Sequence, residues 1–207
     1  MLDAEQTNED YLSEDVSIAN IVASARFDME IELSAVAGEL VSLESGLVEK
    51  FEHRYEKGNR LIISISNNNA VVILTASGVH VLTGAKSHEE LIDARQKFYL
   101  VLEEISLLHS AEVEDIRFID KFSVRNLVCV GELDSEVNLN AASIELGLEN
   151  TEYEPEQFPG LIYRPDGSSE TLLIFASGKI VITGSSDTET SQELFEQLRN
   201  RLSELLE

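Results

Sequence analysis

An internal repeat constrains the fold of this chain more than any other feature of its sequence. Residues 60–84 align without a gap with residues 160–184 at an offset of 100, and eight of these 25 positions are identical. Upstream, residues 20–40 align with residues 126–146 at an offset of 106, with eight identities in 21 positions. Self-similarity over so much of the chain indicates two copies of one structural unit. The change of offset places six extra residues between the two aligned stretches of the first copy.

The residue pattern of each copy predicts a strand, a helix, three strands joined by tight turns, and a closing helix. First strands are expected at 20–27 and 126–133, and first helices at about 33–50 and 139–147, with a short additional strand near 113–122. Hairpin turns are expected at Asn67-Asn68-Asn69, Ser77-Gly78, Asp166-Gly167-Ser168 and Ser177-Gly178. The chain is therefore of the α+β class.

Capping boxes predict where the closing helices begin. Ser87 with Glu90 starts one of them, and Thr190 with Glu193 starts the other. An apolar stripe at helical spacing follows each box, through Leu91, Ala94, Phe98, Val101, Leu102, Ile105 and Leu108, and through Leu194, Leu198, Leu202 and Leu205.

The repeat and the charge pattern divide the chain into three segments. Residues 1–17 carry six acids and no base, which predicts an acidic disordered tail. The first repeat is expected at 18–110 and the second at 111–207.

The charge of the chain has two interpretations. Its 15 Lys and Arg against 39 Asp and Glu give a formal charge of −24, which would repel nucleic acid and favour a basic partner. Alternatively, the acidity adapts the whole surface to a high-salt cytoplasm, where charge repulsion is screened. Only six of the cations are lysines, which favours the second interpretation.

Several classes of function are disfavoured by what the sequence lacks. It has a single cysteine, Cys129, and four scattered histidines, so we expect neither a disulfide nor a metal centre. No arrangement typical of nucleophilic catalysis is recognisable, and we expect no enzyme and no cofactor. No apolar run approaches a membrane span and the N-terminus has no signal-peptide pattern, which predicts a cytoplasmic protein.

The strands are apolar at both parities, unlike a sheet with one face in water. This holds along 71–74, 79–82, 172–175 and 180–182. Amphipathic helices cover one face, and the sequence offers no second helical layer. The other face is then an apolar patch that requires a partner.

Three stretches carry a resemblance to a known family: NTEYEPEQFPGLIYR at 150–164, LLIFASGKIVITG at 172–184 and NIVAS at 20–24. Residues 18–207 resemble a TATA-box-binding protein of the archaeal type, closely in the second repeat and more weakly in the first. The resemblance implies a pseudo-twofold saddle, a curved ten-stranded antiparallel sheet with four helices on its convex face.

The resemblance also implies a function. It is that of a basal transcription initiation factor, associated with the nucleoid, whose concave face lies in the minor groove of A·T-rich promoter DNA and bends it. The implied partners are double-stranded TATA-like DNA, transcription factor B and, indirectly, RNA polymerase. The apolar face could also support a homodimer when the protein is free of DNA.

The residues that the resemblance assigns to DNA binding alternate along the strands or flank their ends. They are Asn20, Val22, Ile73, Val81, Thr83, Asn126, Val128, Phe158, Pro159, Arg164, Leu173, Phe175, Ser177, Lys179, Val181 and Thr183, and Thr75 is expected on the same face. None of them is acidic, so the negative charge is expected to lie elsewhere.

The chemistry of these residues suits the minor groove. A·T pairs present only acceptors there, so amide donors from Asn20 and Asn126 accept either orientation of the pair. Alternatively, each asparagine only caps or starts a strand. Phe158 and Phe175 match the family's pair of intercalating wedges, and the alternative for them is core packing.

The first repeat departs from the family pattern at both wedges. At the offset of 100, Gly58 stands where the second repeat has Phe158, and Thr75 where it has Phe175. We therefore expect the second repeat to kink DNA and the first to kink it weakly or not at all.

Two cations that resemble family phosphate contacts are missing in the first repeat as well. Arg164 corresponds to Ser64, and Lys179 corresponds to Val79. The expected affinity for DNA is accordingly poorer than that of an ordinary member.

A loop before the second wedge matches the family's docking site for transcription factor B. The matching residues are Glu154, Glu156 and Gln157, and the alternative is a merely solvated acidic loop. The lengthened segment 41–59 of the first repeat has no partner that the resemblance assigns. A second hypothesis for the whole chain is a regulator that bends DNA weakly or not at all and binds transcription factor B or another protein.

Overall fold

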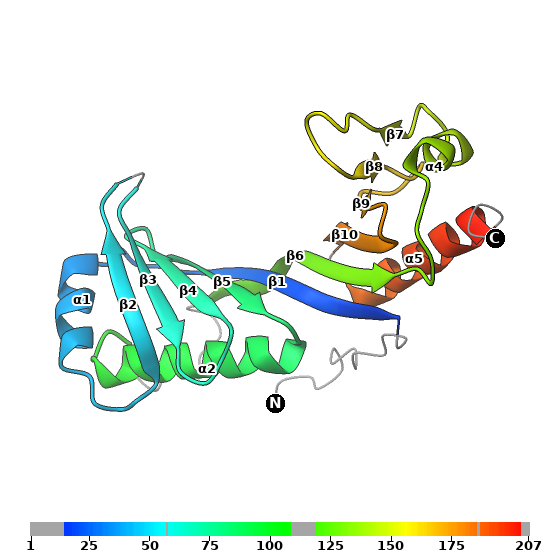
Figure 1. Cartoon of the computed structure of the whole chain (residues 1–207). Helices are drawn as coiled ribbons and strands as arrows, with labels where there is room; N and C mark the ends of the chain where they lie inside the picture. The colour runs from blue at the N-terminus through cyan, green and yellow to red at the C-terminus, as the bar shows by residue number, and fades with distance from the viewer. Residues whose placement is uncertain (1–14, 57, 109–118, 186, 204–207) are drawn as a thin grey trace. The chain divides into compact units, whose positions relative to one another are not determined.

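The computed structural model describes residues 15–56, 58–108, 119–185 and 187–203, and its strands form one ten-stranded sheet (Figure 1). In sheet order the strands are β2 (Val48–Arg54), β3 (Arg60–Ile65), β4 (Val71–Thr75), β5 (Val79–Ala85), β1 (Val16–Phe27), β6 (Ile119–Glu132), β10 (Lys179–Ser185), β9 (Thr171–Ile174), β8 (Leu161–Tyr163) and β7 (Thr151–Glu152). The helices of the described residues are α1 (Leu33–Val41), α2 (His88–Glu104), α4 (Leu139–Leu146) and α5 (Thr188–Leu202). Ten strands and four helices confirm the α+β fold class.

The chain divides into two compact units, which are described one at a time. Residues 20–125 form the first-repeat unit, and Met1–Ala19 together with Asn126–Glu207 form the second-repeat unit.

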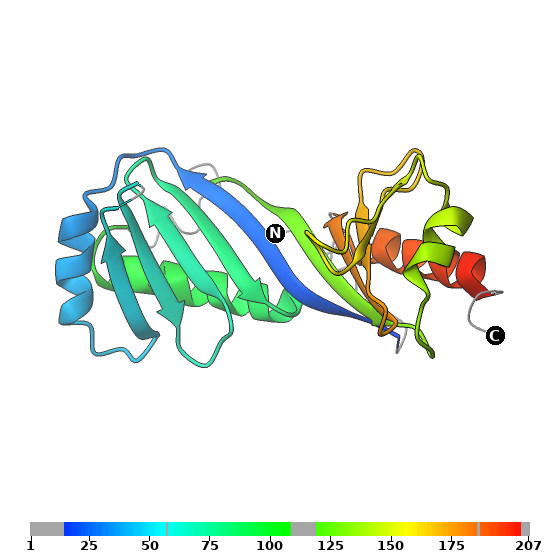
Figure 2. The same ribbon diagram turned by 45° about the horizontal axis from the view of Figure 1, so that its top comes forward.

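In the first-repeat unit, helices cover one face of the sheet (Figures 1 and 2). Helix α1 packs against β2 and β3, and α2 packs against β3 and β5. The stripe expected on α2 supplies the core, because Leu91, Ala94, Phe98, Val101 and Leu102 are buried. The predicted cap is present: Ser87 Oγ accepts a hydrogen bond from the Glu90 N–H at 3.1 Å. This satisfies one of the free donors of the first turn.

The second-repeat unit repeats this arrangement. Helix α5 packs on β10, and α4 contacts α5, β7 and β8. Leu194, Leu198 and Leu202 are buried as expected, whereas Leu205 lies outside the described residues.

The start of α5 differs from the prediction. Its N-cap is Asp187, whose carboxylate accepts a hydrogen bond from the Thr190 N–H at 2.7 Å, so Thr190 already lies in the first turn. Aspartate is as good a cap as threonine. The Thr190–Glu193 pair matches the capping-box pattern, but the helix begins about one turn earlier, at Asp187.

The first helix of the first repeat is much shorter than predicted. Helix α1 ends at Val41, and β2 begins at Val48, so residues 48–50 belong to a strand instead of the expected helix 33–50. The chain turns between them at Gly46, whose φ of 70° lies in the left-handed region that favours glycine. The apolar residues of β2 also fit a helical period, which misled the prediction.

Three further boundaries differ from the sequence expectations. Strand β1 begins at Val16 rather than at residue 20. Strand β6 runs unbroken from Ile119 to Glu132, so 119–122 are not a separate strand, and the remainder of the strand expected near 113–122 lies outside the described residues. Each repeat also has four strands after its first helix, one more than the residue pattern predicted. Residues 1–14 of the expected tail lie outside the described part of the chain as well.

Candidate functional site

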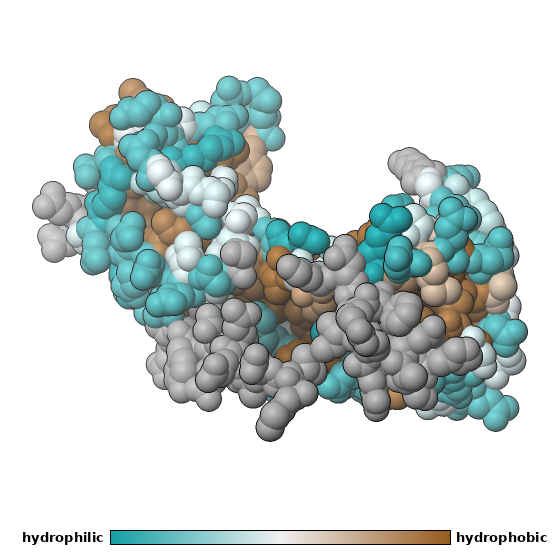
Figure 3. All heavy atoms as spheres, turned by 180° about the vertical axis from the view of Figure 1, so that it is seen from behind, coloured by the Kyte–Doolittle hydropathy of each residue, from teal (hydrophilic) through white to brown (hydrophobic). Residues whose placement is uncertain are grey.

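One face of each unit's sheet is buried under helices, and the other, which we call the open face, is only half-buried. Strand β3 shows the contrast: Leu61, Ile63 and Ile65 are each 0% exposed, while Arg60, Ile62 and Ser64 between them are partly exposed. Successive side chains of a strand point to opposite faces, so the alternation separates the two faces. Apolar residues reach the surface of both units (Figure 3).

The open face of the first-repeat unit is defined by strand register. Val22 pairs with Thr83, Ile73 pairs with Val81, and Ile62 pairs with Ile73. Directly paired residues share a face. The open face of this unit comprises Asn20, Val22, Ser24, Arg26, Lys50, Glu52, Arg54, Arg60, Ile62, Ser64, Val71, Ile73, Thr75, Val79, Val81 and Thr83.

The second-repeat unit has an equivalent open face. Val181 pairs with Val130 and Leu173, and Thr183 pairs with Val128. The strand positions on this face are Asn126, Val128, Val130, Glu132, Glu152, Ile162, Thr171, Leu173, Lys179, Val181 and Thr183, with Arg164 and Phe175 next to strand ends. In each unit, the strand residues that the resemblance assigned to DNA binding therefore lie on one face.

Each open face carries one of the two asparagines, anchored in the same way. The Gly84 N–H donates to Asn20 Oδ1 at 2.7 Å, and the Gly184 N–H donates to Asn126 Oδ1 at 3.0 Å. A backbone N–H requires an acceptor, so these bonds fix which end of each amide is oxygen. Both asparagines lie inside a strand, β1 or β6, so neither starts one as the alternative held, and their bonds tie neighbouring strands together. The nitrogen is the donor end of each amide, and Asn20 Nδ2 gives one of its two N–H groups to Thr83 Oγ1 at 3.3 Å.

Phe158 and Phe175 form a pair of half-buried aromatic rings. Their ring centroids are 5.8 Å apart with the planes at 65°, an edge-to-face arrangement. Gly160 makes this approach possible, because a Cβ there would lie 2.8 Å from Phe158 Cε1 and 3.2 Å from Phe175 Cε1. Pro159 and Ser177, beside the pair, are exposed. Neither ring is sealed in the core.

The loop before Phe158 exposes Glu154, Glu156 and Gln157. It is held by its own backbone, since the N–H groups of Gln157 and Phe158 both donate to the Glu154 carbonyl at 2.9 Å. The Gln157 side-chain amide also donates to the Glu154 carboxylate. The loop therefore presents its carboxylates in a defined conformation.

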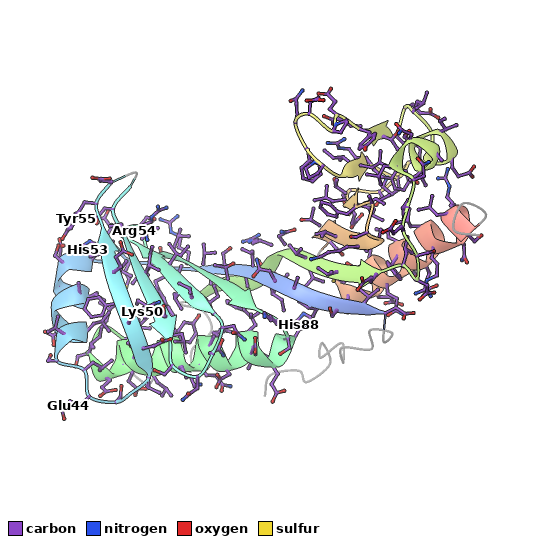
Figure 4. The ribbon with its side chains drawn as sticks, in the orientation of Figure 1. Glu44, Lys50, His53, Arg54, Tyr55 and His88 are labelled. Atoms are coloured by element: carbon purple, nitrogen blue, oxygen red, sulfur yellow. The ribbon has the colours of Figure 1, made fainter. Side chains whose placement is uncertain are left out.

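The first repeat has no aromatic ring at the corresponding positions. Thr75 Oγ1 donates to the Val79 carbonyl at 2.9 Å and so closes its own turn, and Gly58 lies in the β2–β3 loop. At the tip of this hairpin, Tyr55 instead packs against His53 in a tilted arrangement, with ring centroids 4.2 Å apart, and Arg54 pairs with Glu52 at 2.8 Å (Figure 4). The hydrogen bond from Arg54 lowers the pKa of the Glu52 carboxyl below its ordinary value.

The charges of the two open faces differ. The first-repeat face carries Arg26, Lys50, Arg54 and Arg60 against the single carboxylate of Glu52. The second-repeat face carries Arg164 and Lys179 against Glu132 and Glu152, and Arg164 pairs with Glu152 at 3.4 Å. The residues assigned to DNA binding are free of acid, but their neighbours on the same face are not.

The sequence analysis did not identify the four cations on the open face of the first repeat. Arg26 could have been found by counting two positions along the strand from Ser24. Lys50 could not, because it was placed on a helix. Arg54 and Arg60 flank a hairpin that the sequence did not reveal.

The described residues contain no cluster of three or more His, Cys, Asp and Glu side chains able to hold a metal ion. None of the described helices combines the length and the hydropathy that a membrane-spanning segment requires. Cys129 is fully buried on the helix-covered face of β6.

These features define a class of protein: a duplicated α+β fold whose sheet has one face covered by helices and one half-exposed face that mixes apolar and charged residues. Comparison with known proteins gives the family. The sequence model of "Transcription factor TFIID (or TATA-binding protein, TBP)" matches residues 15–105 and 121–205, and the chain belongs to this family. It is a family of transcription factors, which confirms that the chain is not an enzyme.

Relatives from halophilic archaea match nearly the whole chain. The chain is 37% identical over 191 residues to TATA-box-binding protein C of Halobacterium salinarum, covering 92% of this chain and 99% of the relative. It is 36% identical over 192 residues to the TATA-box-binding protein of Haloarcula marismortui, covering 93% and 95%. The solved structure of Methanococcus jannaschii TBP matches with a TM-score of 0.70 at 31% identity, covering 92% of this chain and 99% of that one.

Proposed function

We propose that this protein initiates transcription by binding the minor groove of A·T-rich promoter DNA with both open faces, bending it, and recruiting transcription factor B. Support comes foremost from a half-exposed face in each repeat that combines Val, Ile or Leu side chains with one anchored asparagine amide. The amide nitrogens donate to the acceptors that A·T pairs present, and the flanking methyl groups of Val and Thr exclude the guanine amino group by shape.

Phe158 and Phe175 insert between base steps at the second repeat. Their half-burial and mutual packing hold the rings in a fixed orientation, so that little side-chain entropy is lost on insertion. The first repeat has no such pair, and its contribution is contact without a strong kink. Glu154, Glu156 and Gln157 present the surface for transcription factor B.

A gel shift in molar salt on a duplex with a TATA-like element tests this function. Wild-type protein should shift the duplex, and Phe158→Ala should weaken binding by about tenfold or more, because each unstacked step costs a few kcal/mol that the wedge offsets. Tyr55→Ala is the matched control, since this exposed aromatic is not on the open face. Absence of any shift across the salt range would overturn the proposal.

A second candidate is a regulator that binds transcription factor B without bending DNA. The observation that favours it is the absence of wedge rings at Gly58 and Thr75. Adding transcription factor B to the same gel separates the two functions. The initiation factor forms a ternary complex that Glu154→Lys with Glu156→Lys removes while the binary complex persists. The regulator binds transcription factor B without any DNA shift.

A further inference from the structure

The missing cations of the first repeat have counterparts one strand away. In the second repeat, Lys179 on β10 pairs directly with Glu132 on β6. In the first repeat, the equivalent pair is Val79 on β5 and Arg26 on β1. Compared with the second repeat, the first repeat carries the cation of this cross-strand pair on the other strand, and it has no acidic residue in the pair.

The second missing cation shows the same relation. The Arg164 N–H donates to the Asn150 carbonyl at 2.8 Å, which joins these two residues across the edge of the second-repeat sheet. At the offset of 100 they correspond to Ser64 and Lys50, and these two residues pair directly between β3 and β2. Here too the first repeat carries the cation on the other member of the pair.

Directly paired residues have Cβ atoms about 4.5–5.5 Å apart, which is less than the length of a Lys or Arg side chain. A cation on either member of a pair therefore reaches much of the same space above the open face. Arg26 and Lys50 are both exposed, and neither forms an ion pair within the part of the chain that the structure describes. Their charges are available to a ligand, whereas Arg54 is engaged by Glu52.

We propose that Arg26 and Lys50 contact DNA phosphates at the first repeat, taking over from the cations absent at Val79 and Ser64. This inference rests on the proposed DNA-binding function. It revises the expectation of poorer affinity, because the first-repeat face holds more free positive charge than the second.

Salt dependence of DNA affinity tests this directly. Each phosphate contact removed should change the slope of log K against log salt concentration by about 0.9. Arg26→Val and Lys50→Ser should each produce this change, as should Arg164→Ser and Lys179→Val in the second repeat. Lys97→Gln is the control, because this lysine lies on α2 and pairs with Asp93 at 2.7 Å, and its removal should leave the slope unchanged. Far-UV circular dichroism checks that each variant folds.

Moving the charge back across each pair is the sharper test. Arg26→Val with Val79→Arg, and Lys50→Ser with Ser64→Lys, keep the composition and restore the second repeat's pattern. Both double variants should recover the wild-type slope. Wild-type slopes for Arg26→Val and Lys50→Ser, alongside altered slopes for Arg164→Ser and Lys179→Val, would overturn the inference and leave the proposed function standing. If the double variants do not recover the wild-type slope, the claim that a cation on either member of a pair serves the same phosphate is wrong. A wild-type protein that does not bind DNA would overturn both proposals.

Discussion

At the scale of single residues, the two asparagines show how one side chain can serve the fold and the surface together. Asn126 Oδ1 accepts the Gly184 N–H, and Asn20 Oδ1 accepts the Gly84 N–H. The sequence predicted these residues through the repeat and the resemblance, but not the hydrogen bonds, because a pairing over |i−j| of 58 or 64 residues depends on strand register.

The first prediction separates the two roles of Asn126. Asn126→Asp keeps the acceptor for Gly184 but removes the amide donor and adds a charge at the open face. We expect the free energy of unfolding to change little and DNA affinity to fall by about tenfold or more, given about 1–3 kcal/mol per base contact. Fluorescence anisotropy with a labelled duplex measures this.

Asn138→Asp is the matched control for that variant. Asn138 caps α4 through its side-chain oxygen, a role aspartate fills equally well, and it makes the same change of charge. Equal loss of DNA affinity in both variants would show that net charge, and not the amide at the open face, is responsible.

A second prediction concerns His80, which is fully buried beneath the first-repeat sheet. It stacks on Phe27 with ring centroids 4.3 Å apart, its Nε2 lies 3.2 Å from the Tyr99 hydroxyl, and Arg95 is the nearby charge. Burial lowers the pKa of His80 from 6.5 to about 4. The unfolded state therefore binds a proton between these pH values while the folded state does not, and stability present above pH 6.5 is lost as the pH falls toward 4.

Denaturant unfolding at pH 7.5 and pH 5 measures this contribution. His80→Ile, which copies Ile180 of the second repeat, serves as the reference. The unfolding free energy of the wild type minus that of this variant should be lower at pH 5 than at pH 7.5 by about 2 kcal/mol. The subtraction removes the pH dependence that other titratable groups contribute equally to both proteins, and the comparison of two pH values removes any constant effect of the substitution. A difference that stays the same at both pH values would contradict the buried neutral imidazole.

At the scale of elements, prediction from sequence succeeded where the period was regular and failed where a register shift interrupted it. The stripe of α2 was found because Leu91, Ala94 and Phe98 recur only at helical spacing. Strand β2 was assigned to a helix, since Val48 and Phe51 are three residues apart, which is a helical spacing. In the structure a register shift between Val48 and Lys50 pairs both residues with buried positions of β3, Ile65 and Ile63. The two open-face cations of β2, Lys50 and Arg54, were missed together with that strand.

The cap of α5 gives a prediction at this scale. Asp187→Ala should lower the free energy of unfolding by about 1 kcal/mol, because the Thr190 N–H loses its acceptor. Thr190→Ala is the control and should cost less, since only its backbone N–H takes part in the cap. Thermal or denaturant unfolding compares the two variants. A larger loss of unfolding free energy for Thr190→Ala would instead support a helix that begins at Thr190, as the sequence predicted.

At the scale of the whole molecule, the two repeats have diverged into different surfaces on the same scaffold. The second repeat keeps the aromatic pair and the acidic loop. The first repeat has a longer connection between α1 and β2, and an open face with four cations in a chain of net charge −24. The duplication and the fold class could be read from sequence because identities recur at a fixed offset. The charge asymmetry could not, because it depends on which strands are neighbours.

The central claim is that both open faces bind DNA and only the second repeat kinks it. The most direct measurement uses 2-aminopurine placed at either end of a TATA-like element, with protein at saturation confirmed by anisotropy. Wild-type protein should raise the fluorescence by unstacking bases, and Phe158→Ala should abolish the rise at both ends, whichever way the protein sits on the element. Persistence of about half the signal in Phe158→Ala would reveal a second kink made by the first repeat and would contradict the account.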